Sequence, residues 1–160
     1  MRVRLIACVV CAVAGTAAVS AVGGHADPAP MGTTFLLKFQ PQLAHFVDAA
    51  PKRGMNHPTP GDVLIGASKV YDQAGTRSLG RTAELCTITS GGSNFACALD
   101  ATLLMRAGTL VVNGDPHPSR TPWTAAVVGG TGVYAGARGT LHVTNAPHDT
   151  GEYWRYDPAP

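Results

Sequence analysis

From residue 62 onward, the sequence alternates between short apolar segments and clusters of turn-forming residues. The turns are rich in Gly, Asp, Asn and Ser, as at 72–75 (DQAG) and 90–93 (SGGS). Short strands at regular spacing with such turns are typical of β-sandwiches and β-barrels, and no segment shows a sustained helical period. The sequence therefore predicts an all-β fold with strands at 63–71, 81–89, 94–104, 109–112, 123–128, 139–144 and 152–156.

The segment before residue 62 is less regular. A run of β-branched, aromatic and aliphatic residues predicts a first strand at Thr33 to Phe39, closed by Pro41. Residues 42–50 are compatible with one or two helical turns. Residues 51–61 contain three prolines and are expected to form a loop.

The N-terminus has the pattern of a secretory signal peptide. Arg2 and Arg4 precede the apolar run Leu5 to Val13, and Gly24-His25-Ala26 offers a small-residue cleavage site. Cleavage after Ala21 and retention as a membrane anchor are the alternatives. We therefore expect a signal peptide at 1–26, a loose N-terminal segment with the first strand at 27–60, a barrel domain at 61–160, and a secreted or cell-surface protein.

Removing residues 1–26 lowers the basic count from 12 to 10, which equals the 10 acidic residues. The mature chain would be formally neutral. It has no arginine run and no basic patch interleaved with aromatic residues, so we expect no nucleic-acid partner.

Two cysteines would remain after cleavage, and an even number in an exported chain indicates a disulfide. If Gly91-Gly92 forms a two-residue hairpin loop, Ser90 pairs with Ser93 and Cys86 pairs with Cys97. That register places the cysteines at a hydrogen-bonded pair, which suits a disulfide less well. A bulge or a longer loop would remove the difficulty.

Several motifs follow one another along the chain: 61–63 (GDV), 68–71 (SKVY), 85–88 (LCTI), 94–96 (NFA), 111–114 (VVNG) and 126–139 (AVVGGTGVYAGARG). Their series resembles the allene oxide cyclase barrel-like family and its dirigent relatives. The resemblance covers roughly residues 60–145, and the stretch at 126–139 (AVVGGTGVYAGARG) is its most specific part. It implies an eight-stranded antiparallel β-barrel around an apolar cavity, often oligomeric in the plant members.

The glycines at 129–132 could be mistaken for a dinucleotide-binding loop. The next glycine, Gly136, is one position too late for that motif counted from Gly130, and too little chain remains for a βαβ unit. A tight corner between two strands is the favoured interpretation.

The resemblance also suggests site residues. In the plant cyclases an asparagine on the strand matching 63–71 holds a water, and Ser68 stands there. A cavity-lining cysteine is matched by Cys86. The glutamate of the first strand has no match, because Lys38 is the only charged residue at 33–39.

Dirigent proteins suggest a second mode, in which acidic residues assist as the barrel steers a reactive intermediate. Glu84 has the same parity as Cys86 and Ile88, so it should share their face of the strand. In a cavity it would be desolvated and could act as a general acid or base. A surface carboxylate near Arg81 is the alternative. Asp100 has the opposite parity to Leu99 and should point outward.

The histidines and serines of the sequence show no spacing typical of a metal site or of a catalytic triad. No histidine pair has metal-ligand spacing, and no nucleophile elbow is present, so we expect no metal site and no Ser–His–Asp triad. Tyr153, Trp154 and Tyr156 are expected to close the barrel or face an oligomer partner. The histidines considered are His45, His57, His117, His142 and His148.

The sequence thus predicts a secreted barrel that binds or steers a small apolar molecule without a cofactor. The alternatives are a cofactor-free isomerase or cyclase, and a non-catalytic structural or interaction protein; a homo-oligomer is a further open possibility. The candidate catalytic residues are Glu84 and Ser68, and the candidate ligand-binding residues are Cys86, Ile88, Phe95 and Leu99.

Overall fold

The computed structural model describes residues 32–116 and 121–160, which form ten strands and three short 3-10 helices. The expected signal peptide, residues 1–26, lies outside the described residues. Within them, no helix is long and apolar enough to cross a membrane. The elements are β1 (Thr33–Phe39), η1 (Pro41–Leu43), β2 (His45–Val47), β3 (Val63–Gly66), β4 (Ser68–Asp72), β5 (Ser78–Ser90), β6 (Ala96–Met105), β7 (Gly108–Gly114), β8 (Trp123–Gly130), η2 (Gly132–Tyr134), β9 (Gly139–Asn145), η3 (Pro147–Asp149) and β10 (Glu152–Pro158).

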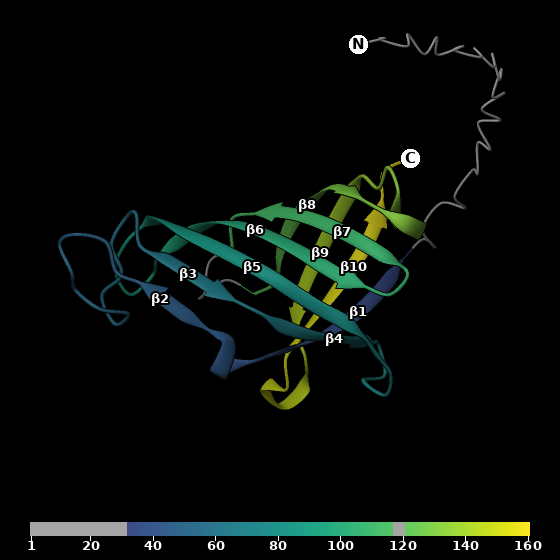
Figure 1. Ribbon diagram of the computed structural model, residues 1–160, viewed down its shortest axis with the longest axis horizontal. Coiled ribbons are helices and arrows are strands. Elements are labelled where there is room, and N and C mark those ends of the chain that lie inside the picture. Colours follow the sequence, from purple (N-terminus) through teal and green to yellow (C-terminus); the bar gives the residue numbers. More distant parts are fainter. Residues whose placement is uncertain (1–31, 117–120) are drawn as a thin grey trace, which may run out of the picture.

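Eight of these strands close into an antiparallel barrel (Figure 1), as the sequence predicts. The order around the barrel is β5-β4-β1-β10-β9-β8-β7-β6, and β6 pairs with β5 to complete the ring. The remaining strands, β2 and β3, extend one end of the barrel, where β3 pairs with β5 and β2 pairs with β3. Closure leaves no free edge around the ring of eight strands.

Two predicted elements differ from the structure. The strand expected at 63–71 is interrupted at Ala67, and both of its parts, β3 and β4, lie along β5. The helical turns expected at 42–50 are limited to η1, after which the chain enters β2. Pairing with β3 explains this difference, because tertiary hydrogen bonds override a local helical preference.

One half of the barrel interior is filled by side chains. Inward-facing residues alternate along most strands of the barrel, and several large ones in this half are 0–1% exposed, among them Leu103, Leu110, Leu141 and Tyr156. Phe35 packs edge-to-face on Tyr134, with ring centroids 6.5 Å apart. We call this end, which holds the turns β4–β5, β6–β7 and β8–β9, the closed end.

The glycine-rich segment forms the predicted corner between β8 and β9. Gly132 has a φ of +61°, in the left-handed region that favours glycine, and it opens the single turn of η2. A Cβ atom there would also overlap the carbonyl oxygen of Ala107. The corner therefore needs glycine for both its backbone angle and its close packing on the β6–β7 turn.

The β5–β6 hairpin has a different register from the one predicted. Cys86 pairs with Leu99, and Ile88 pairs with Cys97, with a bulge between Ile88 and Ser90. The loop spans residues 91–95 rather than two residues, because the Gly92 N–H donates to the carbonyl of Pro58 instead of forming a tight turn. The predicted strand start at 94 is therefore too early, and Phe95 lies in the loop.

The predicted disulfide between Cys86 and Cys97 is present. It joins diagonal rather than directly opposite neighbours, with a Cα–Cα distance of 5.5 Å. Both cysteines lie on the inner face of the barrel wall, so the bond faces the interior rather than solvent.

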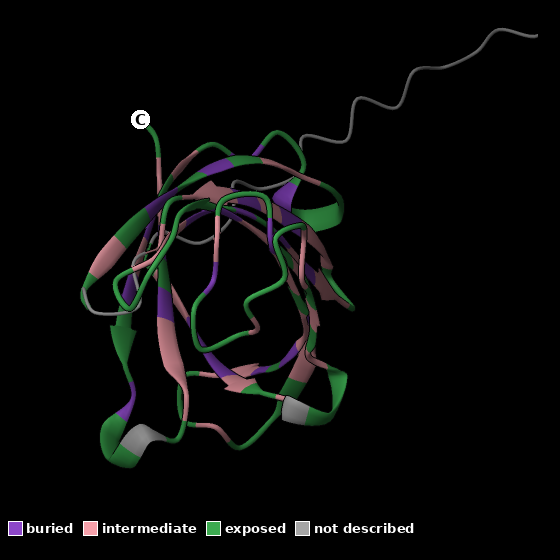
Figure 2. Ribbon diagram, turned by 90° about the vertical axis from the view of Figure 1, so that its left-hand side faces the viewer, coloured by how far each residue is buried: buried purple, intermediate pink, exposed green. Residues whose placement is uncertain are grey.

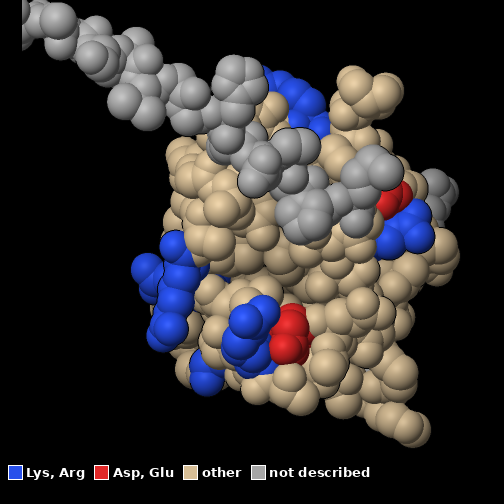
Figure 3. Space-filling view, turned by 90° about the vertical axis from the view of Figure 1, so that its right-hand side faces the viewer, with Lys and Arg blue, Asp and Glu red and all other residues tan. Residues whose placement is uncertain are grey.

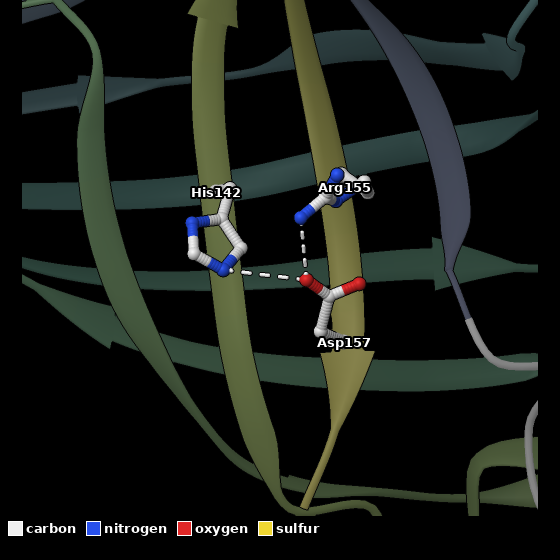
Figure 4. A network of polar contacts seen from close by, with 3 residues as sticks. All are labelled: His142, Arg155 and Asp157. Atoms are coloured by element: carbon white, nitrogen blue, oxygen red, sulfur yellow. Dashed lines mark hydrogen bonds and ion pairs between the residues drawn. The ribbon is translucent and has the colours of Figure 1, made fainter.

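The outer surface carries most of the charged groups. At the closed end, shown in Figure 3, basic side chains gather, and the turns there contribute the exposed Arg77, Arg106 and Arg138. On the outer face of β9 and β10, Asp157 accepts contacts from Arg155 at 2.7 Å and from His142 at 3.3 Å (Figure 4). Asp100 is exposed, as its parity predicts.

Candidate functional site

The other half of the barrel, which we call the open end, is hollow. It contains a cavity of about 590 Å³ with a mainly apolar lining. Figure 2 views the barrel from this end, where most of the segments that connect the strands are exposed. The lining combines strand residues with residues of four connections between strands, among them Ala44, Met55, Phe95 and Pro116. Phe39 and Met55 are more than half exposed and form part of an apolar rim.

A smaller, more polar space of about 350 Å³ shares part of this lining. Ser68 and Asn145 line it, and Glu84, Glu152 and Trp154 line both spaces. The two glutamates therefore mark the boundary between an apolar chamber and a polar recess.

Glu84 reaches this boundary from the inner face of β5. The Thr82 hydroxyl, which is buried on the same face, donates a hydrogen bond to Glu84 Oε1. Thr82 in turn accepts a 2.7 Å bond from the backbone N–H of Ser68 at the start of β4. The buried Ser68 thus helps to orient Thr82 and, through it, the carboxylate.

Glu152 reaches the boundary from the start of β10. The indole Nε1 of Trp154 donates a 2.9 Å hydrogen bond to Glu152 Oε2. Trp154 is 3% exposed and packs edge-to-face on Trp123, with ring centroids 6.0 Å apart. The orientation of Glu152 is therefore fixed by the buried Trp154, which packs on the partly buried Trp123.

The environment of Glu152 changes its proton affinity. Burial raises the pKa of Glu152, the hydrogen bond from Trp154 lowers it, and the charge of Glu84 raises it again. The net pKa lies above the ordinary Glu value. Two carboxyl groups that interact in an apolar chamber, one of them with a raised pKa, can hold and transfer a proton.

The sequence-predicted residues lie around this cavity with one exception. Cys86, Phe95 and Leu99 line the chamber, and Glu84 and Ser68 line it or its recess. Ile88 is 1% exposed and, among the described residues, is not part of either lining. It lies instead beside the loop before β3, where its N–H donates to the carbonyl of Asp62.

Glu152, an acid that was not predicted from the sequence, lies on the last strand beside the first strand. Lys38 lies over the ring of Tyr71 at 4.8 Å, and Glu152 pairs with Leu37 of β1 across the β1–β10 ladder. Sequence analysis missed Glu152, although it shares the parity of Trp154 and Tyr156, both buried. That alternation was the signal that could have placed Glu152 inside the barrel.

Residue types that bind metal ions do not cluster in the described part of the chain. Among residues 32–116 and 121–160, no group of three or more His, Cys, Asp or Glu side chains could hold a metal ion. His117, one of the histidines considered, lies outside the described residues.

The fold is shared with dirigent-like barrels, although no family model and no curated protein matches the sequence. A pyocyanin demethylase superposes with a TM-score of 0.66 at 22% identity, covering 80% of this chain and 99% of its own. The pterocarpan synthase dirigent protein PsPTS1 has a TM-score of 0.57 at 19% identity, covering 79% and 90%. A nonspecific heme-binding cyclase that catalyses a [4 + 2] cycloaddition in neoabyssomicin biosynthesis has a TM-score of 0.53 at 18% identity, covering 80% and 62%.

Proposed function

We propose that this chain is an exported barrel that binds or steers a small apolar molecule in its open half. The observation that carries this proposal is the chamber of about 590 Å³, lined mainly by apolar side chains and bounded by two carboxyl groups. Sites for small molecules are concave and mostly apolar, with a few polar groups that fix orientation. Both requirements are met on the inner faces of rigid strands.

The similar folds are consistent with this use. The names of the three proteins describe chemistry on small molecules, and their barrels superpose on most of this chain. Because a fold hosts many functions, the support for this proposal comes from the chamber and its carboxyl groups rather than from the likeness alone.

Export is the second part of the proposal. The signal-like residues 1–26 and the disulfide between Cys86 and Cys97 both suit an extracellular or cell-surface location. The mass of the denatured, unreduced protein recovered from its host's culture fluid would fix the cleavage site. A polypeptide that keeps residues 1–26 would contradict secretion with cleavage.

Binding can be tested by filling the chamber from Gly66. A Cβ atom on Gly66 would lie 3.5 Å from Cε2 of Phe39 and 3.6 Å from Oε2 of Glu84, in ordinary contact with the lining. Gly66→Ala should therefore be tolerated, whereas Gly66→Phe should project a ring into the chamber. We expect the neutral apolar dye N-phenylnaphthylamine to bind the wild type and Gly66→Ala. Gly66→Phe should bind it at least about tenfold more weakly, because an occupied pocket excludes the dye.

Circular dichroism of the three proteins controls for folding. Equal dye binding by wild type and Gly66→Phe would show that the dye does not use the chamber. Native mass spectrometry of the same preparation gives the mass of any ligand retained from the host and the number of chains in a homo-oligomer.

The second candidate function is a cofactor-free isomerase or cyclase. It is favoured by the carboxyl pair, since an acid with a raised pKa beside a second carboxylate is suited to proton transfer at a bound molecule. The resemblance of the sequence to allene oxide cyclase barrels also favours this second candidate function. Turnover of the retained ligand by wild type, lost in Glu152→Gln and Glu84→Gln, would establish it. A ligand that stays unchanged would favour binding without chemistry.

A further inference from the structure

Among the residues that the structure describes, the charged groups lining the chamber and its recess are all acidic. Of the described lining residues, Glu84 and Glu152 are the only ones with an ionisable side chain, because Cys86 and Cys97 are joined as a disulfide. No Lys, Arg or His of the described residues lines either space. The basic residues Arg77, Arg106 and Arg138 lie on turns at the closed end, on the far side of the packed core.

Each carboxylate uses one of its two oxygen atoms for a hydrogen bond within the protein. Thr82 donates to Oε1 of Glu84, and Trp154 donates to Oε2 of Glu152. Among the described residues, neither Oε2 of Glu84 nor Oε1 of Glu152 has a hydrogen-bond or ion-pair partner. An ionised carboxylate oxygen can only accept hydrogen bonds, so a ligand that matches these two oxygen atoms offers a donor or a positive charge.

Aromatic rings complete this environment. Trp123, Trp154, Phe39 and Phe95 line the same chamber as the two acids, and Trp154 is hydrogen-bonded to Glu152. The faces of aromatic rings attract cations, and the attraction is larger where water is excluded. The apolar lining and the negative charge therefore favour the same kind of molecule.

We propose that the ligand of this chamber is an apolar molecule that carries a positively charged nitrogen, seated between Glu84 and Glu152. This inference rests on the proposed function and specifies its ligand class. A molecule with a carboxylate would place a negative charge beside these two acids, in a space where the described residues provide no countercharge. A neutral molecule of the same shape would provide no positive charge opposite the two carboxyl groups.

Three probes of similar shape test the proposal: N-methylquinolinium, which is cationic, methylnaphthalene, which is neutral, and naphthoate, which is anionic. Affinities are measured by quenching of tryptophan fluorescence at neutral pH. We expect the cation to bind at least about tenfold more tightly than methylnaphthalene, because its attraction to the carboxyl groups and to the aromatic rings is stronger where water is excluded, and naphthoate to bind most weakly.

Substitutions of Glu84 and Glu152 test whether these two acids cause the preference for the cationic probe. Glu84→Gln and Glu152→Gln keep the shape of each side chain and an acceptor for Thr82 or Trp154. The double variant should lose the preference for the cation while it binds methylnaphthalene as before, which also shows that the barrel is folded. Asp100→Asn removes the same charge from the exposed outer face of β6 and should leave all three affinities unchanged.

The outcomes separate this inference from the function on which it rests. Methylnaphthalene binding as tightly as N-methylquinolinium would overturn the inference and leave an apolar ligand site in place. A preference for the cation that persists in the double variant would also overturn it. Binding of none of the three probes would overturn both the inference and the proposed function.

Discussion

The carboxyl group of Glu152 lies where the barrel is apolar, and its position has a cost in stability. Burial raises its pKa, and the charge of Glu84 raises it further. The folded chain therefore holds this proton more tightly than the unfolded chain does. Stability falls as the pH rises from the ordinary Glu pKa through the raised value, and above that value the loss is complete. A group that weakens the fold in this way is more readily explained by function than by structure.

This linkage predicts that Glu152→Gln is more stable than the wild type at neutral pH. The amide keeps an acceptor for Trp154 but has no charge to desolvate and none to repel Glu84. We expect the melting temperature to rise by a few degrees at neutral pH, and the difference to shrink as the pH falls towards the ordinary Glu pKa. Thermal unfolding over a pH series measures this, with Asp100→Asn as the control for net charge. A variant less stable at neutral pH would contradict it.

The sequence and the structure differ in an instructive way for these two residues. Parity along one strand suffices to group Glu84 with Cys86. Parity would also have grouped Glu152 with Trp154, but nothing local to either segment brings the two acids together. Their strands are separated by β4 and β1 in the barrel order, so the meeting of Glu84 and Glu152 depends on closure of the whole sheet.

At the scale of elements, strand existence was predictable and strand register was not. The alternation of apolar residues and the turn clusters place β1 and β5 to β10 within a few residues, whereas β3 and β4 were expected as one strand. The β5–β6 register, by contrast, is set by contact with the segment at 58–60, where Pro58 accepts the Gly92 N–H. The two-residue hairpin rule contains no information on that distant segment. The register predicted from it therefore placed Cys86 opposite Cys97, whereas Cys86 pairs with Leu99.

The disulfide is predicted to stabilise this hairpin even though the cysteines are not directly opposite. It closes a loop with a sequence separation of 11, for which the chain-entropy model gives about 3 kcal/mol. We expect Cys86→Ser with Cys97→Ser to lower the free energy of unfolding by up to about that amount, as measured by urea denaturation. Dithiothreitol should destabilise the wild type to a similar extent and leave the double variant unchanged. An equal effect of dithiothreitol on both proteins would argue against the bond.

At the scale of the whole molecule, the interior of the barrel has a packed half and a hollow half. The closed end is filled by aliphatic and aromatic side chains that are almost fully buried, and the open end keeps a chamber. The resemblance implied an apolar cavity, but the share of the interior that stays empty depends on how side chains from all eight strands meet. That quantity is not encoded in any single segment, and this is why Phe95 and Leu99 could have been expected to fill the chamber rather than line it.

This division predicts different effects for the same substitution at two positions of β6. Leu103 is 0% exposed within the packed core, whereas Leu99 is 7% exposed and borders the chamber. Leu103→Ala should create a new void and lower the free energy of unfolding by about 3 kcal/mol or more. Leu99→Ala enlarges an existing space and removes fewer packing contacts, so we expect a loss of about 1–2 kcal/mol.

Urea denaturation of the two variants measures the difference, and dye binding gives a second readout. Leu99→Ala should change the affinity for N-phenylnaphthylamine because its side chain faces the chamber, while folded Leu103→Ala should bind the dye as the wild type does. Both leucines face inward from the same strand, so the two substitutions change strand propensity equally and affect the same hairpin. A difference in stability between the variants therefore reports on packing. Equal losses of stability would therefore mean that the open end is packed as tightly as the closed end, and the chamber would no longer account for binding.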